Sequence, residues 1–501
     1  MAIVINEYDK TKAAASEYAN FAVLIPGAVA SGKGDCFDDN DIYECASQAD
    51  FEDKIGLAQL ASFSVGEKVE AKACEAEAIE IGDGDYYEIE PDIDVYTREE
   101  LKDANSVGRL ISYDAGTKKY YKYTYLFHSD GHGLFSKNET YYRVTELGQD
   151  AQEPTENDTQ IGNQIAYELL GLGYTVYYKK IDADTNFTNI FAGLEDKANY
   201  DFRYIMSGFI DPSDDIQKAM MDLANTRQDC IALLDIKRES YKNKSLAEKV
   251  TGIANYVNGC SDAGKNCAFF APSVTYSLQR SAAYKEAYVN NYKFPASFHY
   301  LACAAKSSER YAEWYANSGY TRGISDFNIA SVDAIFGEAA IEKLQPRAVK
   351  DGIETKHAVN LIAKFRDQYL LWGNRTAYVL RNENSALGDL VASDFLNIRQ
   401  LCCTLKKQIY VACRQLSFDP NSNVLWFNFK NKIRPILEKM KTDQGIEDYE
   451  FVKIETDKKA TLKAQIRIIP IEAVEDFNID VMLEDNLEGV VIGDTDNSEN
   501  E

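Results

Sequence analysis

The segment most suggestive of chemistry runs from Gly27 to Gly34 and reads GAVASGKG. It matches the phosphate-binding pattern GxxxxGK[ST] except at its last position, where a Ser or Thr hydroxyl would ligate magnesium. In such sites a helix begins at the lysine and directs its amide groups at the phosphate. Here Gly34 replaces the hydroxyl, and the acidic run GDCFDDNDIYEC follows Lys33. A loop leaving a strand is therefore favoured, and a nucleotide-binding enzyme built on Gly27–Lys33 is kept as the alternative.

Histidine and cysteine chemistry finds little support in the sequence. His128 and His132 are four residues apart, but Gly131 and Gly133 in the same run predict a turn rather than a helical metal pair. The ten cysteines form no CxxC pair and lie mostly in apolar runs, as is typical of reduced, buried thiols. A GxSxG nucleophile elbow is absent. We therefore expect no catalytic centre, no cofactor and no metal site.

Net charge limits the partners of the chain. Its 501 residues include 54 Lys and Arg against 80 Asp and Glu, a formal charge of −26. Such a balance repels phosphate, so neither nucleic acid nor an anionic membrane is expected as a main partner. No run approaches the ~18 apolar residues of a spanning helix, and the first residues lack the pattern of a secretion signal. We expect a soluble protein, long enough for about three domains.

The elements that would position any site follow an alternating pattern from residue 158 onward. Helices are predicted at 161–170, after Ser213 and at 246–257, and strands at 21–25, 174–178, 230–236 and 267–270. Short, continuously apolar strands are typical of a sheet buried on both faces. The sequence therefore predicts an α/β core with a mainly parallel sheet and flanking helices.

Two further regions differ from this core. Residues 62–157 are rich in Tyr, Val, Thr, Glu and Gly, which predicts an inserted all-β domain. The C-terminal third contains a regular helical stripe from Ile398 to Leu416 and a second helical stretch after Trp426, which Pro435 is expected to kink or start. Two alternating strands follow, at 462–468 and 477–483, so an α+β C-terminal domain is expected.

Both ends of the chain carry a strand without an evident partner. Residues 2–6 are β-prone and are joined to the core by a polar linker, and the strand at 477–483 lies just before an acidic end. Unpaired strand edges favour strand addition between chains, which uses main-chain hydrogen bonds. The alternative is that both strands pair with the sheet of their own chain. The sequence favours neither pairing between chains nor pairing within one chain over the other.

Several motifs, in their order and spacing, resemble a known family. The segment 371–376 reads LWGNRT and is similar to a WG-x-RT signature, and 395–401 reads FLNIRQL and is similar to a helix start. The runs FDPN at 418–421 and FPASFH at 294–299, and the helix, glycine turn and strand at 163–181, complete the match. Together they resemble the sheath proteins of contractile bacteriophage tails and related contractile injection systems over residues 158–484, and more loosely over 19–60.

The resemblance implies a fold and a function. The family fold implies subtilisin-like topology in the core, without the Ser, His and Asp arrangement of a protease. Copies would form hexameric rings stacked helically around an inner tail tube, and contraction would drive the tube through the target cell envelope, as in viral genome ejection. The implied partners are further copies, the tail tube, baseplate and tail terminator proteins, with no direct nucleic acid contact and no membrane insertion. The implied location is the virion tail, after assembly in the host cytoplasm. A monomeric intracellular binding module is a second alternative.

The resemblance also divides the chain. The expected parts are an N-terminal linking arm at 1–20, the start of the α/β core at 21–61, an outward-facing β-rich insertion at 62–157, the α/β sheath core at 158–370, the C-terminal sheath domain at 371–475, a C-terminal linking strand at 476–484 and an acidic flexible tail at 485–501.

Particular residues are expected to make the links between copies. The exchanged strands would be supplied by Ile3, Ile5, Phe477, Ile479, Val481 and Leu483, and the receiving sheet would contain Leu462, Ala464, Ile466 and Ile468. The signature residues Trp372, Gly373, Arg375 and Thr376 are expected to be structural. Trp372 would pack against the C-terminal domain and Arg375 would bond to carbonyls or a carboxylate, with direct contact of this pair to the tube as the alternative.

Overall fold

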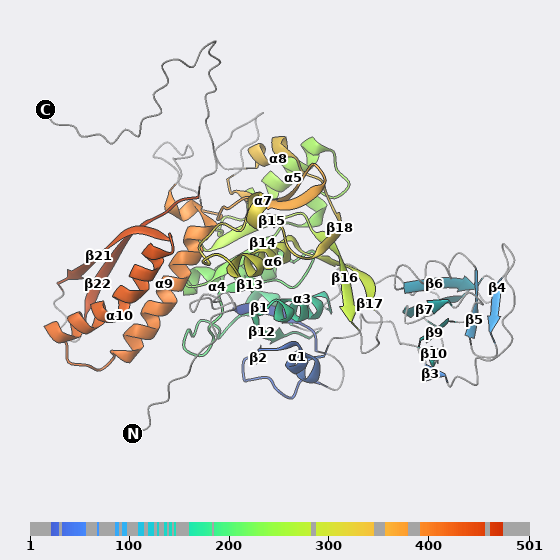
Figure 1. The fold of residues 1–501 in the computed structure, drawn as a ribbon, viewed down its shortest axis with the longest axis horizontal. Helices are drawn as coiled ribbons and strands as arrows, with labels where there is room; N and C mark the ends of the chain where they lie inside the picture. Colours follow the sequence, from blue (N-terminus) through green and yellow to red (C-terminus); the bar gives the residue numbers. More distant parts are fainter. Residues whose placement is uncertain are drawn as a thin grey trace, which may run out of the picture.

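An eight-stranded mixed sheet forms the centre of the fold (Figure 1). Its spatial order is β2 (Ile42–Cys45), β12 (Thr175–Lys180), β1 (Ala22–Gly27), β13 (Tyr204–Met206), β14 (Ile231–Asp235), β15 (Cys267–Ala271), β19 (Val359–Phe365) and β20 (Gln368–Trp372). The six inner strands run parallel, and β2 and β20 are antiparallel edge strands. The structure is a computed structural model that describes residues 22–29, 33–56, 160–182, 185–281, 287–344, 356–378, 391–455 and 461–473, and the backbone of β3 to β11 between 68 and 146.

Helices cover both faces of this sheet. One apolar cluster joins one face to α1 (Gln48–Lys54), α3 (Gln160–Gly171) and α6 (Ala296–Ser308), and the other joins the opposite face to α4 (Asp214–Arg227), α5 (Leu246–Gly259) and α8 (Glu338–Lys343). Ser213 caps α4 as predicted, and Ser245 with Glu248 forms a capping box at α5. The central strands are fully buried because both faces are covered. The predicted α/β core is confirmed.

A three-stranded antiparallel sheet lies beside the core. It has the order β17 (Ala287–Phe294), β16 (Val274–Ser281) and β18 (Asn328–Val332), and the short helix α7 (Gly319–Arg322) precedes β18. Single 3-10 turns occur at η2 (Phe187–Asn189), η3 (Arg238–Ser240) and η4 (Ala392–Asp394). The aromatic rings of Tyr276, Phe294 and Phe298 pack together where β16 and β17 meet α6, which ties this sheet to the core.

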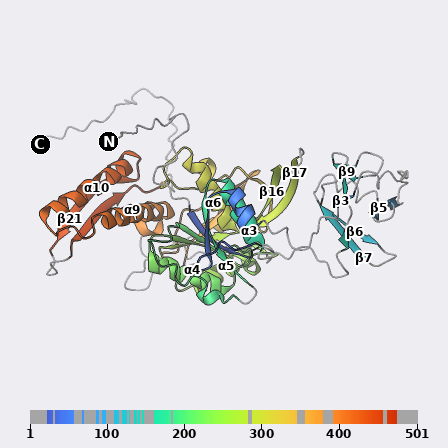
Figure 2. The ribbon, with the colours of Figure 1, turned by 90° about the horizontal axis from the view of Figure 1, so that it is seen from below.

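The C-terminal unit consists of two long helices and a β-hairpin, at one end of the molecule (Figure 2). These are α9 (Leu396–Gln415), α10 (Asn423–Thr442), β21 (Ile446–Ile454) and β22 (Lys463–Pro470). The alternative that Pro435 starts the second helix is wrong, because α10 begins before Trp426 and runs through Pro435. The alternative that Pro435 kinks this helix stays a prediction. Pro435 and Asn431, whose carbonyl loses its helical donor, both lie on the exposed face, where water can replace the missing bond.

Strands β3 to β11 form small antiparallel sheets within the stretch predicted as a β-rich insertion. They are β3 (Lys68–Val69), β4 (Tyr86–Ile89), β5 (Ile93–Thr97), β6 (Arg109–Asp114), β7 (Lys119–Thr124), β8 (His128–Ser129), β9 (Phe135–Lys137), β10 (Thr140–Tyr142) and β11 (Thr145–Glu146). Figure 1 shows them as a group separate from the main sheet. The predicted linking strands, with Ile3 and Ile5 at one end and residues 477–483 at the other, lie outside the described residues.

Within the described part of the chain, no helix is both long enough and apolar enough to cross a membrane.

Candidate assembly interface

The loop after β1 does not form a phosphate-binding site in its described portion. A side chain at Gly27 would collide with Tyr178 and Asn163, so protein atoms fill the space beside this glycine. The Lys33 ammonium donates to the backbone carbonyl of Glu52. The first helix after Lys33 is α1, which begins only at Gln48, so no helix starts at the lysine as the motif requires. The first turn of α3 lies beside the loop instead, and its Asn163 side chain donates to the Ala28 carbonyl at 2.7 Å. The geometry favours the loop interpretation of Gly27–Lys33.

A buried carboxylate at the carboxyl end of β14 was missed by the sequence analysis. Asp235 accepts a hydrogen bond of 2.8 Å from the Ser297 amide and one of 2.5 Å from the Ser297 hydroxyl, at the start of α6. Burial raises the pKa of Asp235 to about 7, against the opposing effect of these hydrogen bonds. An acidic residue ending an apolar strand, with Pro-Ala-Ser at a helix start, is the signal that could have found the pair. The contact anchors α6 to the sheet.

This site is not a catalytic triad. Ser297 and His299 are both fully buried, and the Ser297 hydroxyl donates to Asp235 rather than to a histidine. The His299 ring lies 2.8 Å from the Tyr276 hydroxyl and 3.3 Å from the Gly323 carbonyl, and burial lowers its pKa to about 4. A substrate has no access to the serine, so these groups serve packing.

The Asp235 pKa gives a testable pH dependence. An unfolded aspartate has a pKa of about 3.9, so between that pH and about 7 the folded chain holds one proton more at this site. The free energy of unfolding from this group therefore falls as pH rises through that window. Between about pH 5 and pH 7, the wild-type chain should lose about 2 kcal/mol relative to Asp235→Asn, which keeps the hydrogen bonds without titrating. Urea unfolding at both pH values measures this, with exposed Asp215→Asn as control. Parallel pH profiles for wild type and Asp235→Asn would contradict the assignment.

The signature residues join the core sheet to the start of α9. The Asn360 side chain, on β19, donates to the Arg375 carbonyl at 2.9 Å and accepts from the Arg375 amide at 2.8 Å. The Arg375 guanidinium lies 4.8 Å from the centre of the Phe395 ring, immediately before α9. Gly373 has φ of +146°, and a side chain there would collide with Asn360. Thr376 donates to the Ser393 carbonyl at 2.7 Å. The signature thus fixes the crossing from core to C-terminal unit.

One expectation about the signature is wrong. Trp372 does not pack against the C-terminal unit; its ring centre lies 4.7 Å from that of Phe365 and 6.1 Å from that of Tyr320, both in the core. The physical reason is that β20 pairs antiparallel with β19 as the edge strand of the main sheet, so Trp372 belongs to that sheet. Residue 371, the expected domain boundary, consequently lies inside a core strand.

The β21–β22 hairpin contains the residues expected to receive exchanged strands. Within the described residues each strand pairs only with the other, so both outer edges present free backbone groups. Leu462, Ile466 and Ile468 are half-buried against the α9–α10 cluster, and Ala464 is exposed. A two-stranded sheet is marginal by itself and gains stability from further strands. The sequence analysis missed β21, although Tyr449 and Phe451 alternate with charged residues there.

Buried polar contacts hold α9 against the core. The Arg203 guanidinium, at the start of β13, pairs with Glu313, which also accepts a hydrogen bond from Thr404 of α9. Gln400 donates to the Tyr204 hydroxyl at 2.7 Å, and Lys407 donates to the Phe202 carbonyl at 2.9 Å. Arg203 and Glu313 are almost completely shielded from solvent. Because separating these groups would leave buried charges unpaired, moving the C-terminal unit away from the core costs free energy; we call this set of contacts the rigid contact.

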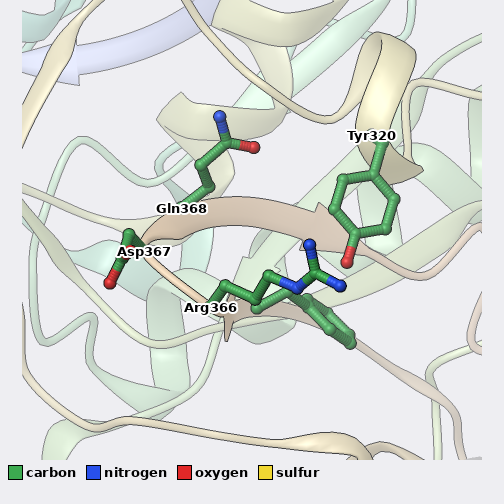
Figure 3. A pocket seen from close by; sticks show the side chains of 5 residues that line it. Tyr320, Arg366, Asp367 and Gln368 are labelled. Atoms are coloured by element: carbon green, nitrogen blue, oxygen red, sulfur yellow. The ribbon is translucent and has the colours of Figure 1, made fainter.

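An open pocket at the β19–β20 turn offers no evident chemistry. It measures about 560 Å³ and is lined by Tyr320, Phe365, Arg366, Asp367 and Gln368. Figure 3 shows the Arg366 side chain directed toward the Tyr320 ring, while Asp367 points away. The lining contains no histidine, cysteine or serine, and Arg366 to Gln368 are exposed turn residues. No group of three or more potential metal ligands occurs among the residues that the structure describes.

The sequence of the chain is similar to that of a phage tail sheath protein. No protein-family model matches it. Over 250 residues it is 24% identical to the tail sheath protein of Vibrio phage KVP40, a match covering 48% of this chain and 34% of that protein. The chain thus spans about a third of the length of the phage protein that it matches.

Solved structures extend the comparison to the fold. A chain in the cryo-EM structure of the 6-fold symmetrised anti-feeding prophage (AFP) baseplate aligns with a TM-score of 0.52 at 12% identity, covering 96% of this chain and 98% of that one. A chain of the AFP helical sheath in the contracted state aligns over the same shares at 12% identity with a TM-score of 0.49. The resemblance to contractile sheath proteins that the sequence motifs indicate is confirmed.

Proposed function

We propose that this protein is a structural subunit of a contractile sheath. In this proposal, copies assemble as stacked hexameric rings around an inner tail tube, and contraction drives the tube through a target envelope. The observation that carries the proposal is the β21–β22 hairpin, whose two free edges and half-buried apolar face can accept strands from other copies. The similarity of this chain to the tail sheath protein of Vibrio phage KVP40 and to a chain of the AFP baseplate supports the same role.

The rigid contact between the core and C-terminal unit defines how such a subunit would act. The Arg203–Glu313 pair and its neighbours resist relative motion within the chain. Rearrangement in the assembly would then occur between subunits, with the terminal strands acting as links. Heterologous contacts whose rotation does not close produce a helix, as stacked rings require. No nucleotide is needed, because an extended lattice can be kinetically trapped and can release free energy on contraction.

The remaining assignments follow from this role. We infer a non-enzymatic protein of a virion tail or a comparable contractile particle, assembled in the host cytoplasm, with a baseplate, a tail terminator and a tube as partners. The division into an N-terminal arm (1–20), core, outward β-rich insertion (62–157), C-terminal domain, linking strand (476–484) and acidic tail (485–501) is part of the proposal. Subtilisin-like topology of the core also remains a proposal.

Strand exchange can be tested at the C-terminal link. Ile479→Asp with Val481→Asp should weaken the links between copies, because both apolar side chains lie on one face of the alternating strand. The yield of tubes in negative-stain electron microscopy should fall about tenfold or more, since burying two carboxylates against an apolar face costs several kcal/mol. The matched control is Asn478→Asp with Met482→Asp on the other face. Equal tube yields for both variants and the wild type would refute strand exchange by 477–483.

A further inference from the structure

The two C-terminal helices are basic in an otherwise acidic protein. Residues 396–442 contain nine basic and two acidic residues, whereas the whole chain has a net charge of −26. Arg399, Lys406, Tyr410 and Arg414 are spaced so that they lie on one face of α9. We use the name α9 groove for this face, with Arg399 and Lys406, together with the hollow lined by Lys197, Lys407, Tyr410, Val411 and Arg414, among others.

Positively charged side chains lie close together at the end of the groove nearest the N-terminus of α9. Arg399 and Lys406 both donate to the backbone carbonyl of Gln228, Lys406 at 2.9 Å. Arg399 is 5% exposed, and its Nε atom has no hydrogen-bond partner. Burial, Arg399 and Lys265 together lower the pKa of Lys406. The carboxylates of the groove, Asp201 and Asp229, are already bonded to Lys407 and Arg227. This end is therefore a set of cations that an additional anion would stabilise.

The end of the groove nearest the C-terminus of α9 contains a hollow and exposed apolar side chains. A cavity of about 370 Å³ is lined by Lys197, Lys407, Tyr410, Val411 and Arg414, among others. Tyr410 and Val411 are 36% and 52% exposed. The Arg414 guanidinium lies over the Tyr410 ring, 5.8 Å from its centre. Such a surface suits a segment that carries both carboxylates and aliphatic side chains.

The end of this chain has that composition. Residues 472–501 contain eleven acidic residues and no basic ones, and Leu487, Val490, Val491 and Ile492 lie among the acids. The described chain ends at Ala473. At about 3.3 Å per residue, the 28 residues that follow can extend up to ~90 Å.

We propose that the acidic segment 484–501 of one copy binds the α9 groove of a neighbouring copy. The proposal rests on the proposed function, because the linking strand at 476–484 must first carry the segment to that neighbour. Its carboxylates would pair with Lys406 and Arg414, the buried Arg399 would add positive potential beneath them, and its aliphatic side chains would cover Tyr410 and Val411. Arg399 and Lys406 each already donate one hydrogen bond to the Gln228 carbonyl. Arg414 and Lys197 line the hollow and do not donate to that carbonyl.

Photo-crosslinking in the assembled full-length protein tests this proposal. A photo-crosslinking residue replaces Leu487, and isotopically heavy and light chains are mixed before assembly. We expect crosslinks to residues 406–414 in heavy–light pairs. Lys406→Glu with Arg414→Glu should lower that crosslink yield about tenfold, because two attractions become repulsions. Adding Glu484→Lys, Asp485→Lys and Glu488→Lys should restore it. The matched control is Lys432→Glu with Arg434→Glu, two exposed positions on α10.

The outcomes separate this inference from the proposed function. Tubes in electron microscopy whose crosslinks fall outside α9, or only within one chain, would overturn the groove assignment and leave the sheath role intact. An equal loss of crosslinks in the α10 control would also overturn the groove assignment, because a nonspecific effect of net charge would then explain the loss. A protein that forms no tubes and no crosslinks between chains would contradict both proposals.

Discussion

Deletion of residues 1–20 should abolish tube formation and leave a folded core. The described core begins with β1 at Ala22, whose six residues are buried and paired on both sides within the main sheet. The deletion removes no residue of that strand, so the free energy of unfolding should change little. It does remove Ile3 and Ile5, which are proposed to supply a strand to another copy. Negative-stain electron microscopy for tubes and circular dichroism melting for the core measure the two effects.

Point variants make this test sharper. Ile3→Asp with Ile5→Asp in the full chain should reproduce the loss of tubes, because both side chains would lie on one face of the proposed strand. Thr11→Asp with Ala13→Asp, in the polar linker, is the matched control and should assemble normally. Normal tubes from the chain that lacks residues 1–20 would contradict the hypothesis that this segment links neighbouring copies.

Glu313→Ala should lower the free energy of unfolding by about 3 to 5 kcal/mol, the usual cost of leaving a buried ion pair half-removed. The Arg203 guanidinium would remain at 0% exposure without Glu313, and the Thr404 hydroxyl would keep only the Gln400 carbonyl, at 3.2 Å, as an acceptor. Chemical unfolding followed by tryptophan fluorescence measures the loss, and Trp314 of the same segment lies in the C-terminal cluster. Exposed Glu309→Ala is the control and should change stability by less than about 0.5 kcal/mol.

A double variant separates loss of the pair from loss of volume. Arg203→Met with Glu313→Leu replaces both charges by apolar groups and should recover most of the stability that Glu313→Ala loses. If Glu313→Ala were as stable as the wild type, the rigid contact between α9 and the core would lose its main support.

Local periodicity is the part of this fold that the sequence predicts. The α9 stripe, the capped α5 and the apolar β14 are each determined by neighbours within a few turns or one strand, and each occurs near its predicted bounds. Pro435 lies inside α10 rather than at its start, on a solvated helix face where water can replace the missing hydrogen bond. β21 was missed because Glu447, Asp448 and Glu450 weaken its apolar alternation.

Contacts between distant segments could not be predicted in this way. Asp235 and Ser297 are 62 residues apart, and Glu313 and Thr404 are 91 apart. Asp235 and Ser297 each lie in a recognisable local pattern, but neither pattern indicates the partner, and only the packing of separate elements brings the partners together. The Trp372 error has the same origin, since the antiparallel turn that places it on the edge of the main sheet depends on the pairing of β19 with β20.

The rigid contact between core and α9 also has a mechanical consequence. In the proposed sheath, contacts that resist deformation would store little elastic energy, so the Arg203–Glu313 region would transmit force rather than act as a spring. In the proposed sheath, the work of contraction would then come from exchanging one set of contacts between copies for a better set. That work is a sum over subunits, so a longer sheath would deliver proportionally more work over a proportionally longer stroke, at a force that does not depend on its length.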